Sequence, residues 1–180
     1  MAISKIIGSG LGTINSPVEF TSADNLNQLT LSSTDADAGE GPNLVFYRNS
    51  SSPADNDDLS TIDFIGRNDA SQDVTYGQIK AVLLDASDGT EDARLEFYRM
   101  KGGTSSPDLQ LNSEGVVINE GSGDVDFRVE SNGNANMLFV DGGNDVVTIG
   151  GTTVESGDTF SVVESGANVV NSRFRNSNAD

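Results

Sequence analysis

A run of short, strand-like segments in the C-terminal half most constrains what this chain can fold into. Each segment is about five residues long and ends at Gly, Asn or Asp, a pattern that is typical of β-strands separated by turns. The segments span residues 126–131, 137–143 and 146–151, and a variant of the first returns at 159–166. We therefore predict a repetitive β structure, which indicates a structural protein and not a catalyst.

The sequence lacks the residues on which most catalytic and metal sites depend. It contains no Cys and no His, which excludes disulfides, Ser-His-Asp triads, Cys-His dyads and His-ligated zinc. Paired carboxylates could in principle cleave glycans, but none of the 28 acidic residues stands in a distinctive aromatic setting. We expect no enzymatic activity, no catalytic residue and no cofactor.

The charge balance narrows the possible partners. The 28 acidic and 10 basic residues give a net charge of −18, which repels nucleic acid. No stretch approaches about 18 consecutive apolar residues, so we expect no membrane insertion. Residues 1–7 lack the apolar core of a secretion signal.

A chain this polar buries little core by itself. Hydrophobic residues make up 35% of it, against roughly 45–50% in globular domains, although that range also counts Gly. In the strand predicted at 137–140, Met137 and Phe139 would lie on one face and Leu138 and Val140 on the other, so both faces would be apolar. A sheet with one face in water requires only one apolar face. We therefore predict a core shared between copies, as in a homotrimer. The predicted trimer core comprises Phe127, Val129, Leu138, Val140, Val147, Ile149, Phe160 and Val162.

Alternating patterns predict further strands before this region. They lie at Val18–Phe20, Leu29–Leu31, Leu44–Arg48, Ile62–Phe64, Tyr76–Leu84, Leu109–Leu111 and Val116–Ile118. Leu44–Arg48 is echoed by Leu95–Arg99 about 50 residues later, and a Ser-Ser-Pro tripeptide follows both segments. A second echo, from Phe127 to Phe160, is about 33 residues apart. The echoes indicate a loosely repetitive β array, without the strict period of a solenoid.

Two kinds of acidic loop could supply oxygen ligands for Ca²⁺. Residues 55–58 and 85–89 are rich in Asp, but neither has the full EF-hand pattern. Residues 141–151 are similar to the nonapeptide of calcium β-rolls, yet only one imperfect copy is present, whereas that family stacks many copies. We predict no metal site.

The strand-and-turn pattern resembles repeats in the tail fibres and tail spikes of tailed bacteriophages, especially marine ones. Residues 126–145, followed by Val147–Gly150, carry the main likeness, and residues 41–103 resemble the N-terminal half of such fibres. The resemblance covers roughly residues 41–166. It implies an all-β fold of short-strand modules in a parallel homotrimeric fibre, with an extended N-terminal arm, located in the virion tail.

The resemblance also implies that successive parts of the chain have different roles. Residues 1–40, where Gly8, Gly10 and Gly12 oppose helix formation, would be an arm that docks on a tail adaptor or nozzle protein. Residues 41–120 would be a β module with the Phe-Tyr-Arg echo, and residues 121–180 would start a shaft. The apolar anchors of the arm would be Ile3, Ile6, Ile7 and Leu11.

Family members continue into further repeats and a receptor-binding tip. This chain ends at residues 173–180 in what reads as the start of another repeat. We therefore expect a longer polypeptide whose distal part contacts the host receptor, and an intact mass of 18.8 kDa would contradict this. The alternatives are a capsid-decorating head fibre and a calcium-dependent β-roll adhesin.

Overall fold

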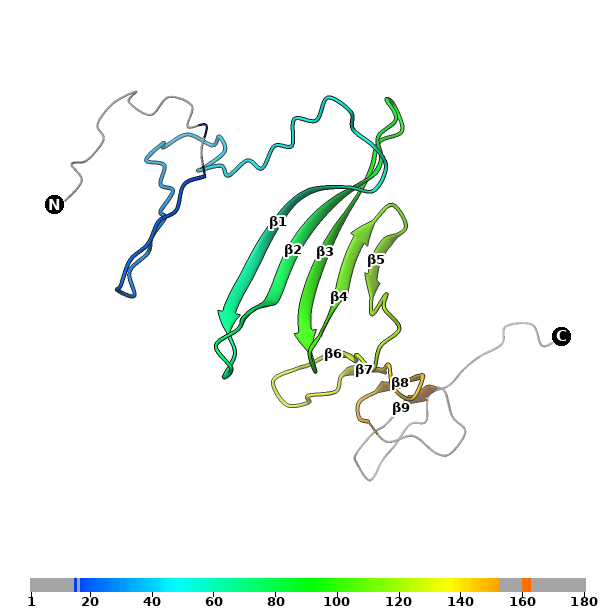
Figure 1. Ribbon diagram of the computed structural model, residues 1–180. Coiled ribbons are helices and arrows are strands. Elements are labelled where there is room, and N and C mark those ends of the chain that lie inside the picture. Colours follow the sequence, from blue (N-terminus) through cyan, green and yellow to red (C-terminus); the bar gives the residue numbers. More distant parts are fainter. Residues whose placement is uncertain (1–14, 16, 153–159, 163–180) are drawn as a thin grey trace. The chain divides into compact units, whose positions relative to one another are not determined.

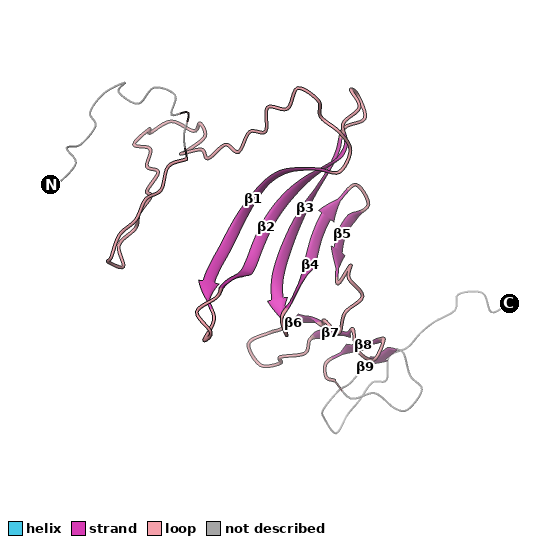
Figure 2. Cartoon of the chain, viewed as in Figure 1, coloured by secondary structure: helices cyan, strands magenta, loops and turns pink. Residues whose placement is uncertain are grey.

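A computed structural model describes residues 15, 17–152 and 160–162 of the chain (Figure 1). The chain divides into two units, the first ending at Val45 and the second beginning at Phe46. The described residues form an all-β structure without helices (Figure 2), as predicted. Within these ranges no helix is long and apolar enough to cross a membrane.

The first sheet is a five-stranded antiparallel meander in the order β1-β2-β3-β4-β5. Its strands are β1 (Asp57–Arg67), β2 (Asp73–Asp85), β3 (Asp92–Lys101), β4 (Thr104–Asn112) and β5 (Gly115–Ile118). The first four have 9 to 13 residues and are longer than the short strands we predicted. Gly102 and Gly103 form the β3–β4 turn with φ of 57° and 83°. Positive φ at both central residues is the geometry of the tightest hairpins, and glycine adopts it without strain.

The second sheet has four short strands in the order β6-β7-β8-β9. They are β6 (Phe127–Val129), β7 (Leu138–Asp141), β8 (Val146–Ile149) and β9 (Phe160–Val162). The first three pair antiparallel, whereas β9 pairs parallel to β8. The predicted boundary at residue 120 lies in the connection between β5 and β6.

Three predicted strands are wrong. The segments have alternating side chains, but their backbones do not pair with another strand: Val18–Phe20, Leu29–Leu31 and Leu44–Arg48. Residues 21–39 instead make local contacts, such as the amide of Leu26 donating to Asp24 Oδ1 at 3.1 Å. An alternating pattern produces a strand only where another strand satisfies its backbone groups, and these segments have no such partner among the described residues. The echo of Leu44–Arg48 at Leu95–Arg99 does lie in a strand, β3.

The connection from β5 to β6 is held by polar contacts at both ends. Asn119, with a φ of 65°, accepts a hydrogen bond from the Gly123 amide at 2.9 Å and donates one to the Gly123 carbonyl at 2.8 Å. Lys101, at the end of β3, donates to the backbone carbonyl of Asp124. On the other side, the Gly142 amide donates to Asp126 Oδ1 at 3.1 Å. The connection is therefore a defined joint between β3 and the β7–β8 turn.

Gly142 is required at this joint because a side chain would not fit. A Cβ at this position would lie 2.5 Å from the Val125 carbonyl oxygen. We expect Gly142→Ala to lower the free energy of unfolding by about 1–3 kcal/mol, since overpacking forces the backbone to shift. Urea titration followed by circular dichroism measures the change. The matched control is Gly133→Ala, where nothing lies within 4 Å of the added Cβ; equal losses in both variants would contradict the close approach.

Candidate functional site

Five apolar residues form a row across the first sheet, one from each strand. Strand register pairs each with the next, and directly paired residues point to the same face of a sheet. The row is Ile62, Ile79, Phe97, Leu109 and Ile118. A second row beside it is Ser60, Ala81, Leu95, Leu111 and Val116. Only Ser60 among these ten residues is polar, and none is charged. We call the two rows, with Phe64 and Leu83 at their flanks, the apolar face.

The apolar face is the more exposed side of the sheet. Phe64 is 56% exposed, Val116 65% and Ile62 40%. The buried residues lie on the other face, where Glu96 is 2% exposed and Gln110 5%. This is the reverse of an ordinary soluble sheet, whose apolar side is covered. The arrangement leaves the apolar face available to another molecule.

The size of the apolar face is that of a binding surface. Five strands about 4.8 Å apart span roughly 24 Å, and the stretch from Gly77 to Leu83 on β2 rises about 20 Å. The projected area is therefore about 500 Å², near the upper end of the largest apolar patch on a typical monomer. Covering one large side chain is worth about 1.5–3 kcal/mol, so this face gives a strong driving force for association.

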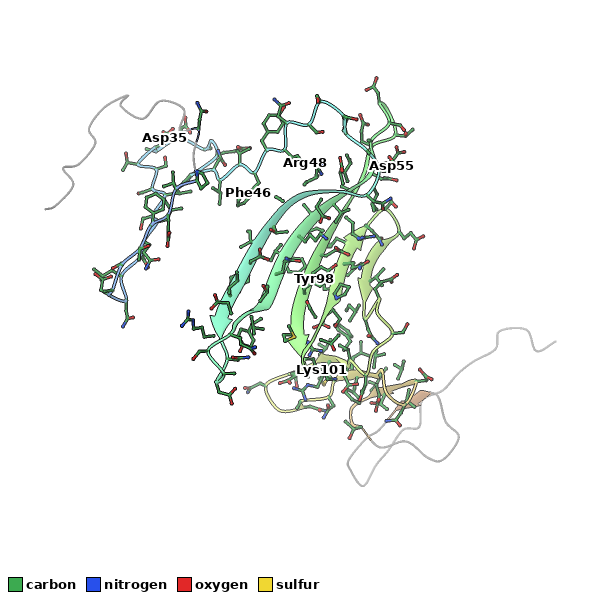
Figure 3. All side chains as sticks on the ribbon, viewed as in Figure 1. Asp35, Phe46, Arg48, Asp55, Tyr98 and Lys101 are labelled. Carbon is green, nitrogen blue, oxygen red and sulfur yellow. The ribbon has the colours of Figure 1, made fainter. Side chains whose placement is uncertain are left out.

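The opposite face carries a polar cluster centred on Glu96 of β3. Gln110 Nε2 donates to Glu96 Oε1 at 3.0 Å, and the Tyr98 hydroxyl donates to Oε2 at 2.9 Å. Arg94 Nε lies 2.8 Å from Glu96 Oε1 as an ion pair without hydrogen-bond geometry. Tyr98 stands near the middle of the sheet in Figure 3. The buried carboxylate is thus held by three neighbours, and each of them comes from β3 or β4.

Burial, and then the hydrogen bond to Glu96, raise the pKa of Tyr98 to about 12. An unfolded tyrosine has a pKa of about 10. Between these values the unfolded chain releases the proton while the folded chain keeps it, so stability falls as pH rises.

We expect the wild type to lose stability relative to Tyr98→Phe as pH rises through about 10 to 12. The loss should not exceed about 1 kcal/mol per pH unit, after discounting for partial exposure. Urea titrations at several alkaline pH values measure the difference. Tyr76→Phe is the control because Tyr76 lies in the same sheet and is 46% exposed. If both variants follow the wild type in parallel, the assignment to Tyr98 is wrong.

The second sheet collects the predicted trimer-core residues into two register rows. Their members are Phe127, Val140, Val147 and Phe160 in one, and Val129, Leu138, Ile149 and Val162 in the other. The six from β6, β7 and β8 share one face. Ile149 is 40% exposed and Val129 43%, whereas Thr148 on the opposite face is 1% exposed. The second sheet therefore repeats the reversed burial of the first.

The two apolar surfaces border a common hollow. Val116 and Ile118 of the first sheet and Phe127 and Val140 of the second line a depression of about 290 Å³, with Val125 between them. The hollow makes the apolar surface continuous across the joint.

A second depression, of about 690 Å³, gathers three of the ten basic residues. Arg99 and Arg128 form ion pairs with Asp108 and Glu130, and Lys101 donates to a backbone carbonyl of the joint. Because each cation already has a partner, this depression is a structural junction and not an anion site.

The β-roll-like sequence at 141–151 forms the β7–β8 turn. Asp141 Oδ1 accepts from the amides of Gly143 at 3.0 Å and Asn144 at 2.9 Å, and Oδ2 accepts from the Asn144 side chain at 3.0 Å. The Asn144 side-chain bond is the main cause of the lowered pKa of Asp141. The Asp141 carboxylate therefore stabilises the β7–β8 turn.

The other acidic loops serve similar local roles. Asp55 Oδ1 accepts from the Ala86 amide at 2.9 Å. Asp85 accepts from the Ser87 amide at 2.8 Å and from the Thr90 hydroxyl at 3.0 Å, and the Ser87 bond leads in lowering the pKa of Asp85. Across the part of the chain that the structure describes, no three acidic residues come together as a metal site.

The predicted docking residues Ile3, Ile6, Ile7 and Leu11 lie outside the described residues. Sequence reasoning missed the apolar face, although it recognised the alternation in Ile62–Phe64 and Tyr76–Leu84. The missing information was the register, because one strand's pattern does not say which neighbouring side chains it meets.

No protein-family description matches the chain, and no curated protein matches it significantly.

Proposed function

We propose that this chain is a structural virion protein: the N-terminal, virion-proximal part of the tail fibre of a tailed bacteriophage. It assembles as a parallel homotrimer, anchors the fibre to a tail adaptor or nozzle protein, and supports adsorption to a host receptor through a distal part. The observation that carries the proposal is the apolar face, much of which stays exposed to water in the described part of a single chain.

Self-association explains this face better than an unrelated partner does. A parallel arrangement around a symmetry axis brings the same register rows of each copy to the same height, so identical apolar residues pack together. A two-fold pairing of sheets would also cover the face. The stoichiometry of three comes from the resemblance to tail fibres.

The distribution of charge fits this assembly. A chain with a net charge of −18 is self-repelling when copies are brought together. The charged residues on the middle of the first sheet, such as Asp58, Lys80 and Glu96, belong to register rows of the opposite face. Like charges therefore stay away from the proposed contact.

We expect residues 1–180, expressed and purified by themselves, to have the mass of a trimer, three times 18.8 kDa. Phe97→Asp, at the centre of the apolar face, should convert trimers to monomers because it places a charge in the core and removes about 1.5–3 kcal/mol of burial per copy. Phe127→Asp should do the same through the second sheet. Size exclusion with light scattering measures the mass.

The matched control is Thr61→Asp, which adds the same charge to the other face of β1. Thr61 pairs directly with Lys80, so the new carboxylate meets an opposite charge. This variant should remain trimeric. Trimers of Phe97→Asp at unchanged mass, or a monomeric wild type, would contradict the proposal.

Two further measurements separate the proposal from its alternatives. Electron microscopy of particles locates the chain on the tail, as proposed, or on the capsid, as a head fibre would be. A calcium-dependent adhesin should lose structure on chelation, whereas the tail fibre should keep its circular dichroism spectrum in EDTA.

A further inference from the structure

The Leu44–Arg48 segment has the sequence of a strand but no partner strand among the residues that the structure describes. Leu44 is 59% exposed, Val45 78%, Phe46 51% and Tyr47 78%. Consecutive large apolar residues rarely remain in water unless another molecule covers them. The segment therefore points to a contact outside the single chain.

The segment has the pattern required to enter the first sheet. Four of its five residues match Leu95–Arg99 of β3. In β3, Leu95 and Phe97 lie on the apolar face, and Tyr98 lies on the other face. As a strand, the segment would place Leu44 and Phe46 on the apolar face in the same way.

The first sheet offers a free edge to such a strand. Within the described part of the chain, β1 pairs only with β2 and is the outermost strand of its sheet. It is 11 residues long, and Phe64 is 56% and Ile65 63% exposed. A long, exposed, apolar edge strand promotes uncontrolled association unless it is covered.

Arg48 shows that the end of the segment is complementary to the start of β1. Its Nη2 atom lies 3.1 Å from Asp57 Oδ1, and Nη1 donates to the Asp58 carbonyl at 2.8 Å. Arg48 makes these two contacts although residues 44–48 do not form a strand. Arg48 is therefore the residue of the segment whose contacts to β1 are formed within one chain.

We infer that the Leu44–Arg48 segment of one copy pairs as an added strand with the free β1 edge of a neighbouring copy. This inference rests on the proposed oligomer. A strand exchanged between copies makes the same kind of backbone contacts that it could make within one chain. The exchange therefore links the copies without requiring a separate binding surface. Antiparallel pairing with Arg48 opposite Asp57, together with the irregularity of β1 between Asp58 and Ser60, sets Phe46 opposite Ser60 and Val45 opposite Thr61. The added strand extends the apolar face of the neighbour by Leu44 and Phe46.

Disulfide cross-linking tests the exchange, since the chain contains no Cys. Chains carrying Val45→Cys and chains carrying Thr61→Cys, with different affinity tags, are co-expressed and oxidised. Opposed residues in an antiparallel pair lie about 4.5–5.5 Å apart, which suits a disulfide. We expect a covalent dimer holding both tags, which only pairing between copies can produce. Pairing Val45→Cys with Ile118→Cys, on the opposite edge strand β5, is the control and should give several-fold less.

The mass of the oxidised, native assembly is measured in the same samples. Trimers without the mixed disulfide, or with equal yield from the β5 control, would overturn the exchange and leave the proposed trimer standing. A disulfide formed only within the chain in a Val45→Cys/Thr61→Cys double variant would also overturn it. A protein that forms no oligomer would contradict the proposed function, and the exchange together with it.

Discussion

The strand register of the first sheet is the constraint on which the rest of this structure depends. A slip of one residue would send every side chain to the opposite face. With the observed register, β2 and β3 align their apolar residues on one side and gather Lys80, Glu96 and Gln110 on the other. Glu96 and Gln110 help to hold this register, because an unpaired buried carboxylate is costly.

The consequence is a chain whose own core is small. Among the described residues, Val82 and Val146 are the only large apolar side chains that are buried, at 3% and 7% exposure. Backbone pairing and polar contacts hold the sheets, and many of the large apolar side chains remain exposed. If contacts between copies form as proposed, the stability of the fold and the concentration of the chain are inseparable.

Sequence reasoning predicted the β class and the location of most strands from β1 onward. It also singled out the eight residues that the register collects in the second sheet, because their short, turn-bounded segments repeat. It failed for Leu44–Arg48, whose pattern equals that of Leu95–Arg99. The two segments differ at one residue, Val45 against Glu96, and in whether a neighbouring strand is present, and a local pattern does not contain that second piece of information. The apolar face was missed for the same reason, since it is formed by five separate strands.

The parallel pairing of β9 with β8 determines how this architecture can grow. β6 and β8 run in one direction because each is antiparallel to β7, and the parallel ladder gives β9 that same direction. Phe160 and Val162 take the register positions that Phe127 and Val129 take at the start of the sheet. A three-strand unit can therefore be copied by translation alone, without reversal, and each copy advances the sheet by three strand spacings, about 14 Å.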